Sequence, residues 1–327
     1  MQPSEHADRA RALSPAWAVA AAFGLATTAL ALSGRFASDE GQITFLGANL
    51  AAESPAAALF FQKLHPTLSL LYLPTSPVGW EAFLVAHCLV AALGVLAAWR
   101  WLDAEGLTGW VGGCALALSP AYAYSSLTGQ SNSDGVALLF VALWASRARG
   151  VGLRVAAGAL FGLLPWARYE FAPFVLLAVV MAARRGDRAL AAGAVAAAST
   201  YLLAGSVYHQ SGLWLFRSPP IEARLAPLVS EMFTPRLGAR TLPRVLGAYG
   251  LTSGLWPLLL SPLAWARGGT ARGLVGVSLA LLLGFTVSPF FGLSGPEIVP
   301  RYLSVALPGS RGRRGLSPRR RRGGPCR

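Results

Sequence analysis

Charged residues are scarce in this sequence. Only 13% of its 327 residues are Asp, Glu, Lys or Arg, and Lys63 is the single lysine. Soluble domains carry about 25% charged residues, so this chain could not cover a water-facing surface with charge. With 54% hydrophobic residues and a mean hydropathy of +0.50, the composition excludes a soluble globule and predicts a polytopic membrane protein.

Cysteine is equally rare. The sequence has three, of which Cys88 and Cys114 lie in apolar runs and Cys326 is the penultimate residue. This spacing excludes a disulfide framework and a cysteine-based metal site. No repeat of fixed period is evident either, which weighs against the inverted-repeat transporter architectures.

Apolar runs predict an all-α bundle of about nine membrane spans, since crossing the hydrocarbon core takes about 20 such residues. The expected spans are 14–34, 80–101, 108–127, 134–147, 151–167, 171–183, 189–208, 246–266 and 273–291. With residues 1–13 in the cytoplasm, every short inner loop is basic, as the positive-inside rule requires. Long outer loops are then expected at 35–79, helical or irregular, and at 209–245. An Ala-Leu-Ala triplet at 29–31 leaves a cleaved signal peptide as an alternative.

The formal charge of +14 is concentrated at one end of the sequence. Eight arginines fall in the last 17 residues, so the rest of the chain carries +6, an ordinary positive-inside excess rather than a signal for nucleic acid. Segment 309–327 follows an apolar run at 303–308, so the membrane domain is expected to cover 14–308. The Arg-, Gly- and Pro-rich segment predicts either a disordered tail or the product of a shifted reading frame beginning near 308–311.

Several predicted spans are short and carry polar residues at their outer ends. Arg154 and Arg168 are 14 residues apart, as are Glu170 and Arg184, which corresponds to about 20 Å of helix. The hydrocarbon core is about 30 Å thick. If the inner arginines lie at the headgroups, then Asp134, Arg168 and Glu170 are recessed in a polar cavity that opens outward. The alternative is that the inner arginines snorkel and the helices are ordinary.

Two further polar groups lie in the first outer loop. Asp39 and Glu40 are adjacent, so their side chains point in different directions and are not expected to share a proton. One of them can face a reacting hydroxyl while the other braces the loop; alternatively Ser38 and Asp39 cap a helix. His65 precedes Pro66 in the same loop, where a lone histidine commonly makes a loop hydrogen bond.

These motifs share one expected side of the membrane and occur in a definite order. They are Asp39-Glu40, His65-Pro66, Gln130-Ser131-Asn132-Ser133-Asp134, Arg168-Tyr169-Glu170 and Arg301-Tyr302. In this order they resemble the GT-C superfamily of polytopic glycosyltransferases, specifically the bacterial members related to protein O-mannosyltransferases and the lipid A aminoarabinose transferase. The resemblance covers about residues 14–308. The sequence departs from it in having Thr67 where many members have a second proline, and in ending soon after Arg301.

The resemblance implies an enzyme of the bacterial inner membrane whose active site faces outward. Its donor would be a sugar on a polyprenyl phosphate, and its acceptor a hydroxyl of a lipid, glycan or protein, with inversion at the sugar carbon. Asp39 is the expected base and Glu40 its support; Arg168 and Arg301 are expected to bind the donor phosphate, and Tyr302 is an expected substrate-binding residue. The expected pocket residues are His65, Asp134 and Glu170. Some relatives bind a divalent metal, for which His65 and Glu40 are candidate ligands. Two alternatives stay open: a transporter or flippase of a lipid-linked anion, and an inactive fragment.

Overall fold

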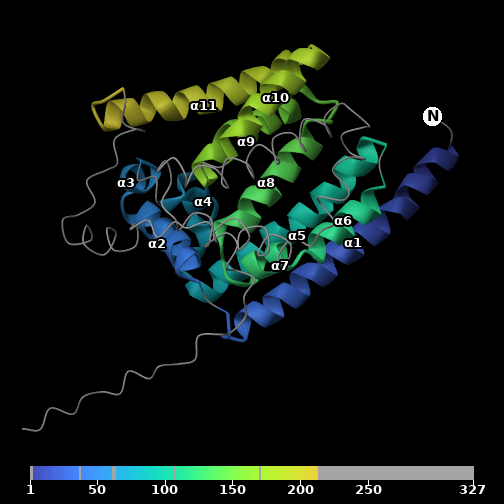
Figure 1. Cartoon of the computed structure of the whole chain (residues 1–327), viewed down its shortest axis with the longest axis horizontal. Coiled ribbons are helices and arrows are strands. Elements are labelled where there is room, and N and C mark those ends of the chain that lie inside the picture. Colours follow the sequence, from blue (N-terminus) through green and yellow to red (C-terminus); the bar gives the residue numbers. More distant parts are fainter. Residues whose placement is uncertain (1–2, 37, 61–63, 107, 169–170, 213–327) are drawn as a thin grey trace, which may run out of the picture.

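The computed structural model describes residues 3–36, 38–60, 64–106, 108–168 and 171–212 (Figure 1). All regular secondary structure in these ranges is helical, which confirms the prediction of an all-α fold as far as the structure describes the chain. The predicted spans 246–266 and 273–291, most of the second long loop and the segment 309–327 lie outside the described residues.

Three helices are long and apolar enough to cross a membrane. They are α1 (Pro3–Leu32), whose apolar part is Pro15–Leu32, α5 (Trp80–Ala104) and α11 (Arg188–Tyr208). Each coincides with a predicted span. The helix α1 also includes most of the segment predicted as a separate N-terminal region, because it begins at Pro3.

The other helices in the described part of the bundle are shorter. Helices α8 (Ser131–Ala145), α9 (Val151–Ala167) and α10 (Ala172–Arg185) have 15, 17 and 14 residues, which gives them lengths of about 21–26 Å. They match three predicted spans in position but are shorter than the hydrocarbon thickness of about 30 Å.

One predicted span, 108–127, is divided into two helices. Helix α6 (Gly109–Ala117) ends before Ser119, and α7 (Pro120–Leu127) begins directly after it. Pro120 has no N–H to continue the first helix but suits the first position of the second. The Ser119 side chain caps α7 by accepting a hydrogen bond from the Tyr122 amide at 3.5 Å. Apolar composition alone did not predict this break.

The segment predicted as the first outer loop is mostly helical. It contains α2 (Asp39–Glu53), α3 (Pro55–Phe60), α4 (Pro66–Leu71) and the 3₁₀ helix η2 (Leu73–Thr75). These elements gather at the left of Figure 1, beside the start of α8 and the end of α9. We call this the site end of the bundle. The opposite end, toward the right, is where α5, α8 and α10 end and where α1, α6, α9 and α11 begin.

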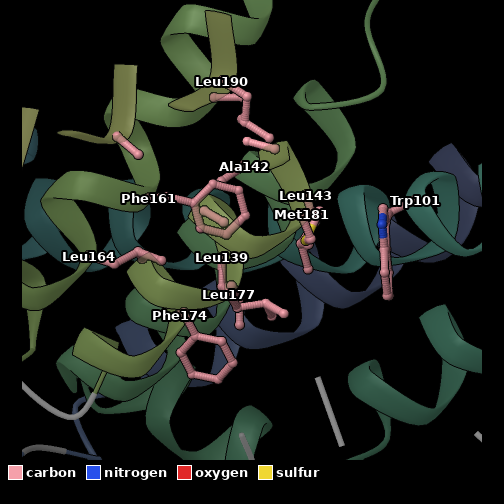
Figure 2. Close-up of a cluster of buried hydrophobic side chains, with 14 residues drawn as sticks. Trp101, Leu139, Ala142, Leu143, Phe161, Leu164, Phe174, Leu177, Met181 and Leu190 are labelled. Carbon is pink, nitrogen blue, oxygen red and sulfur yellow. The ribbon is translucent and has the colours of Figure 1, made fainter. Parts of the chain in front are cut away.

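The hydrophobic core is centred on α8, α9 and α10. Figure 2 shows Phe161 and Leu164 of α9 close to Leu139 of α8, with Leu177 of α10 nearby. All four side chains are buried. Trp101, near the end of α5, lies at the edge of the same cluster (Figure 2).

Helices α9 and α11 approach each other through small residues. A Cβ atom on Gly158 or Gly162 would clash with backbone atoms of α11, and one on Gly193 would clash with the backbone of α9. Gly158 and Gly162 are four residues apart, as are Gly193 and Ala197. This is the spacing that lets membrane helices bring their backbones into contact.

Candidate functional site

An ion pair between Glu40 and Arg168 lies at the site end. Arg168 Nη1 contacts Glu40 Oε1, and the Ser131 hydroxyl donates to the same carboxylate oxygen. Arg168 Nη1 also donates to Ser131 Oγ at 2.6 Å. These residues come from three elements: Glu40 from the first turn of α2, Ser131 from the first residue of α8, and Arg168 from the C-cap of α9.

The start of α2 is held against the residues just before α8 by hydrogen bonds and close backbone contacts. The Ser38 hydroxyl accepts a hydrogen bond from the Gly41 amide at 3.0 Å and donates to the Thr128 carbonyl at 2.9 Å. A side chain on Gly41 would overlap Thr128 and Gly129, so only glycine permits this close approach. Gly129 has a φ of +73°, a left-handed conformation that favours glycine. Two glycines thus place Glu40 beside α8.

His65 lies next to this pair. It is the N-cap of α4 and has a left-handed backbone, with φ of 53°. The Thr67 hydroxyl in the first turn of α4 donates to the Leu163 carbonyl at 2.9 Å, which ties α4 to the end of α9. Burial and the neighbouring charge of Arg168 lower the pKa of His65 to about 4, although Glu40 and the Ala167 carbonyl raise it in part. His65 is therefore neutral at pH 7.

The Glu40 carboxyl is ionised at the same pH. Burial raises its pKa, but the charge of Arg168 and the hydrogen bond from Ser131 outweigh this effect, so the pKa lies below its ordinary value. The side chain of Arg168 is only 4% exposed, whereas that of Glu40 is 26% exposed. Glu40 is thus an ionised carboxylate, partly accessible and held in a fixed orientation by two donors.

Asp134 lies deeper in the bundle and is fully buried. Its Oδ1 accepts a hydrogen bond from the Tyr72 hydroxyl at 2.5 Å and lies 3.0 Å from His87 Nδ1. Burial and the charge of Asp134 raise the pKa of the Tyr72 hydroxyl, which therefore stays protonated as a donor. The other oxygen, Oδ2, is buried and has no hydrogen-bond partner among the described residues. Asp134 was expected to shape a pocket; in the structure it connects α8 with Tyr72 at the end of α4 and with His87 of α5.

The first turn of α8 connects these two groups of residues. Ser131 contacts the ion pair, while Ser133 Oγ lies 3.1 Å from His87 Nε2, which is also 3.1 Å from the Ser125 carbonyl. Neither Ser131 nor His87 was predicted as a site residue. The signals were present, since His87 is an ionisable residue in an apolar span and the run at 130–134 is entirely polar.

The remaining predicted site residues are placed only in part. Asp39 is the first residue of α2, directly before Glu40. Glu170, Arg301 and Tyr302 lie outside the described residues, so their predicted roles stay predictions. Of the predicted set, the structure brings Glu40, His65 and Arg168 together and places Asp134 in the adjoining interior.

The described residues do not favour a divalent metal at this site. Within the ranges that the structure describes, no group of three or more His, Cys, Asp and Glu side chains could hold a metal ion. Arg168 and Ser131 both engage Oε1 of Glu40. The described residues therefore supply no ligand set for the metal that the resemblance allows for, and no step is assigned to one.

Comparison of the chain with protein-family models, with curated proteins and with solved structures gives no match.

Proposed function

We propose that this protein is a membrane glycosyltransferase that moves a sugar from a polyprenyl-phosphate donor to a hydroxyl acceptor. The observation that supports it most is the meeting of Glu40, His65 and Arg168 at one end of a helical bundle. Glu40 and Arg168 are 128 residues apart in the sequence. Carboxylate, imidazole and guanidinium groups from three of the sequence motifs therefore lie close together.

The chemistry of transfer requires a base and a cation. The acceptor hydroxyl must lose a proton as it attacks the sugar, and the departing phosphate needs positive charge rather than an acid. In this proposal Asp39 is the base. Glu40 is the ionised group beside it, and Arg168 orients Glu40 and adds positive charge to the site.

The phosphate contact is assigned to Arg301, with Tyr302 beside it, because Arg168 is already engaged with Glu40 and is 5% exposed. His65 stays neutral and so offers a ring nitrogen to a sugar or acceptor hydroxyl. Glu170 is proposed to contact the sugar. The proposed location is the bacterial inner membrane, with the site facing outward.

A deletion strain complemented with single variants would test the proposal. Mass spectrometry of the extracted envelope lipids and glycans should show one sugar missing in the deletion strain and restored by the wild-type chain. Asp39→Asn should fail to restore it, although immunoblotting finds the variant in the membrane fraction. Arg35→Gln, which changes an exposed residue just before α2, is the matched control and should restore the sugar.

Three other outcomes would contradict the proposal. Full restoration by Asp39→Asn would remove the assigned base and with it the glycosyltransferase assignment. A lipid-linked anion that changes leaflet without a new glycosidic bond would show a flippase. No chemical difference between the deletion and wild-type strains would favour an inactive fragment.

A further inference from the structure

The opposite end of the bundle carries an excess of positive charge. Seven arginines lie where α5, α8 and α10 end and where α6, α9 and α11 begin, against three carboxylates, giving a net formal charge of +4. The arginines are Arg100, Arg147, Arg149, Arg154, Arg184, Arg185 and Arg188, and the acids are Asp103, Glu105 and Asp187. We call this set the basic end.

Each of the three carboxylates already has partners within the protein. Glu105 Oε1 accepts from Arg147 Nε at 2.8 Å and lies 3.6 Å from Arg185 Nη2, so two guanidinium groups share one oxygen. Asp187 caps α11 through the Leu190 amide and pairs with Arg154 at 3.3 Å. Asp103 accepts from the Gly109 amide of α6 at 2.9 Å.

Three exposed arginines are left over. Among the residues that the structure describes, no carboxylate pairs with Arg149, Arg184 or Arg188, and all three are exposed. Helix dipoles do not offset this charge. Three of the described helices end here and four begin, so the termini add partial positive rather than negative charge.

Large apolar side chains are exposed in the same helix ends. Trp110 is 58% exposed, Trp144 38%, Val151 60% and Leu153 59%. Trp144 lies three residues before Arg147, and Val151 and Leu153 lie between Arg149 and Arg154. Nucleic acid or free phosphate would account for the arginines but not for exposed tryptophan and aliphatic side chains beside them. A membrane interface accounts for both, since tryptophan favours the headgroup region and arginine binds phosphate.

We propose that the basic end binds the headgroups of anionic phospholipids, through Arg149, Arg184 and Arg188. In this arrangement Trp144, Val151 and Leu153 lie against the first methylenes of the acyl chains. Each basic residue near an anionic membrane surface is worth about 1 kcal/mol, which is roughly fivefold in affinity. This inference concerns the end of the bundle away from the candidate active site and does not depend on the proposed function.

Quenching of tryptophan fluorescence by brominated lipids would test the proposal. The full-length protein, purified in neutral detergent, is titrated with dibrominated phosphatidylglycerol or with dibrominated phosphatidylcholine. We expect phosphatidylglycerol to quench at a concentration at least tenfold lower. The triple variant Arg149→Gln/Arg184→Gln/Arg188→Gln should lose at least nine-tenths of this preference, and high salt should reduce it in the wild-type protein.

Two controls make the result specific. The variant Arg319→Gln/Arg320→Gln/Arg321→Gln removes the same charge from the C-terminal segment and should keep the preference. The basic-end variant and the wild-type protein should unfold at the same temperature, because in the described part of the chain Arg149, Arg184 and Arg188 form no ion pair with Glu105 or Asp187.

Three results would overturn the proposal. The first is equal quenching by the two lipids in the wild-type protein. The second is loss of preference in the C-terminal variant rather than in the basic-end variant. The third is binding of a fluorescein-labelled single-stranded RNA that the basic-end variant loses and that phosphatidylglycerol does not displace, which would make nucleic acid the partner.

Discussion

The two ends of the helical bundle hold their charged residues in different ways. At the site end, Arg168 and Asp134 are buried, and their partners come from helices far apart in sequence. At the opposite end, the pairs of Glu105 with Arg147 and of Arg154 with Asp187 are partly exposed.

The difference has an energetic meaning. A buried charge without its partner costs several kcal/mol, whereas an exposed pair contributes little. Only the site end therefore depends on each member of its network, and substitutions at the two ends should have unequal effects.

The largest effect is expected at Asp134. Asp134→Ala removes the buried carboxylate that faces both the Tyr72 hydroxyl and His87 Nδ1 and leaves these two groups only each other, 3.2 Å apart, which should cost about 3–5 kcal/mol of unfolding free energy. Chemical unfolding in detergent micelles measures the loss. The matched control is Asp103→Ala, which removes one hydrogen bond at the opposite end and should cost about 1 kcal/mol. Equal losses would mean that the buried network does not stabilise the site end.

Removal of Arg168 comes next. Arg168→Ala leaves the Glu40 carboxylate in a largely buried position, with an expected loss of about 3 kcal/mol because Glu40 is still partly hydrated. Arg147→Ala, which breaks the exposed pair with Glu105, should cost at most about 1 kcal/mol.

A double variant shows whether this loss arises from the Glu40 carboxylate. Glu40→Gln combined with Arg168→Ala should lose less stability than the sum of the two single variants, because no unpaired charge remains. Strict additivity would contradict the ion pair as the source of the loss.

The last effect is a dependence of stability on pH, which is absent at neutral pH. The pKa of His65 falls from 6.5 to about 4 on folding, so the unfolded chain takes up the proton first as the pH falls. Stability should therefore decrease from pH 6.5 to 4, by at most about 1.4 kcal/mol per pH unit from one group. Glu40, whose folded pKa is also lowered, adds a further decrease below pH 4.5.

Variants at two histidines separate this contribution from others. His65→Asn removes the titrating ring at a left-handed position that asparagine tolerates, and should flatten the slope between pH 6.5 and 4. His209→Asn, at the C-cap of α11, is the matched control. Unfolding temperatures across this pH range measure both, and an unchanged slope in His65→Asn would assign the acid sensitivity to other groups.

The sequence predicted the long helices well. Continuous apolar runs predict α1, α5 and α11. A segment that is removed from water must form the hydrogen bonds of its backbone N–H and C=O groups internally, and a helix does this. The break at Ser119 and Pro120 was missed, since hydropathy does not register a missing N–H or a cap. The helical content of segment 35–79 was only partly predicted, because α3 and α4 have six residues each and short helices depend on tertiary packing.

The candidate site was predicted by residue type rather than by geometry. Glu40, His65 and Arg168 were singled out through a resemblance, and the structure places them together. Their contacts with Ser131 depend on long-range packing, since Ser131 and Glu40 are 91 residues apart. For the same reason the partners of Asp134 could not be read from the sequence. His87 of α5 likewise contacts Asp134 and Ser133 of α8, which lie more than 40 residues away in the sequence.

The small-residue contact between α9 and α11 affects how the bundle can move. Where Gly158 and Gly162 bring one backbone against another, no layer of side chains remains that could change rotamer and let the helices slide. We therefore expect α9 and α11 to move as one rigid body that carries Arg168 with it.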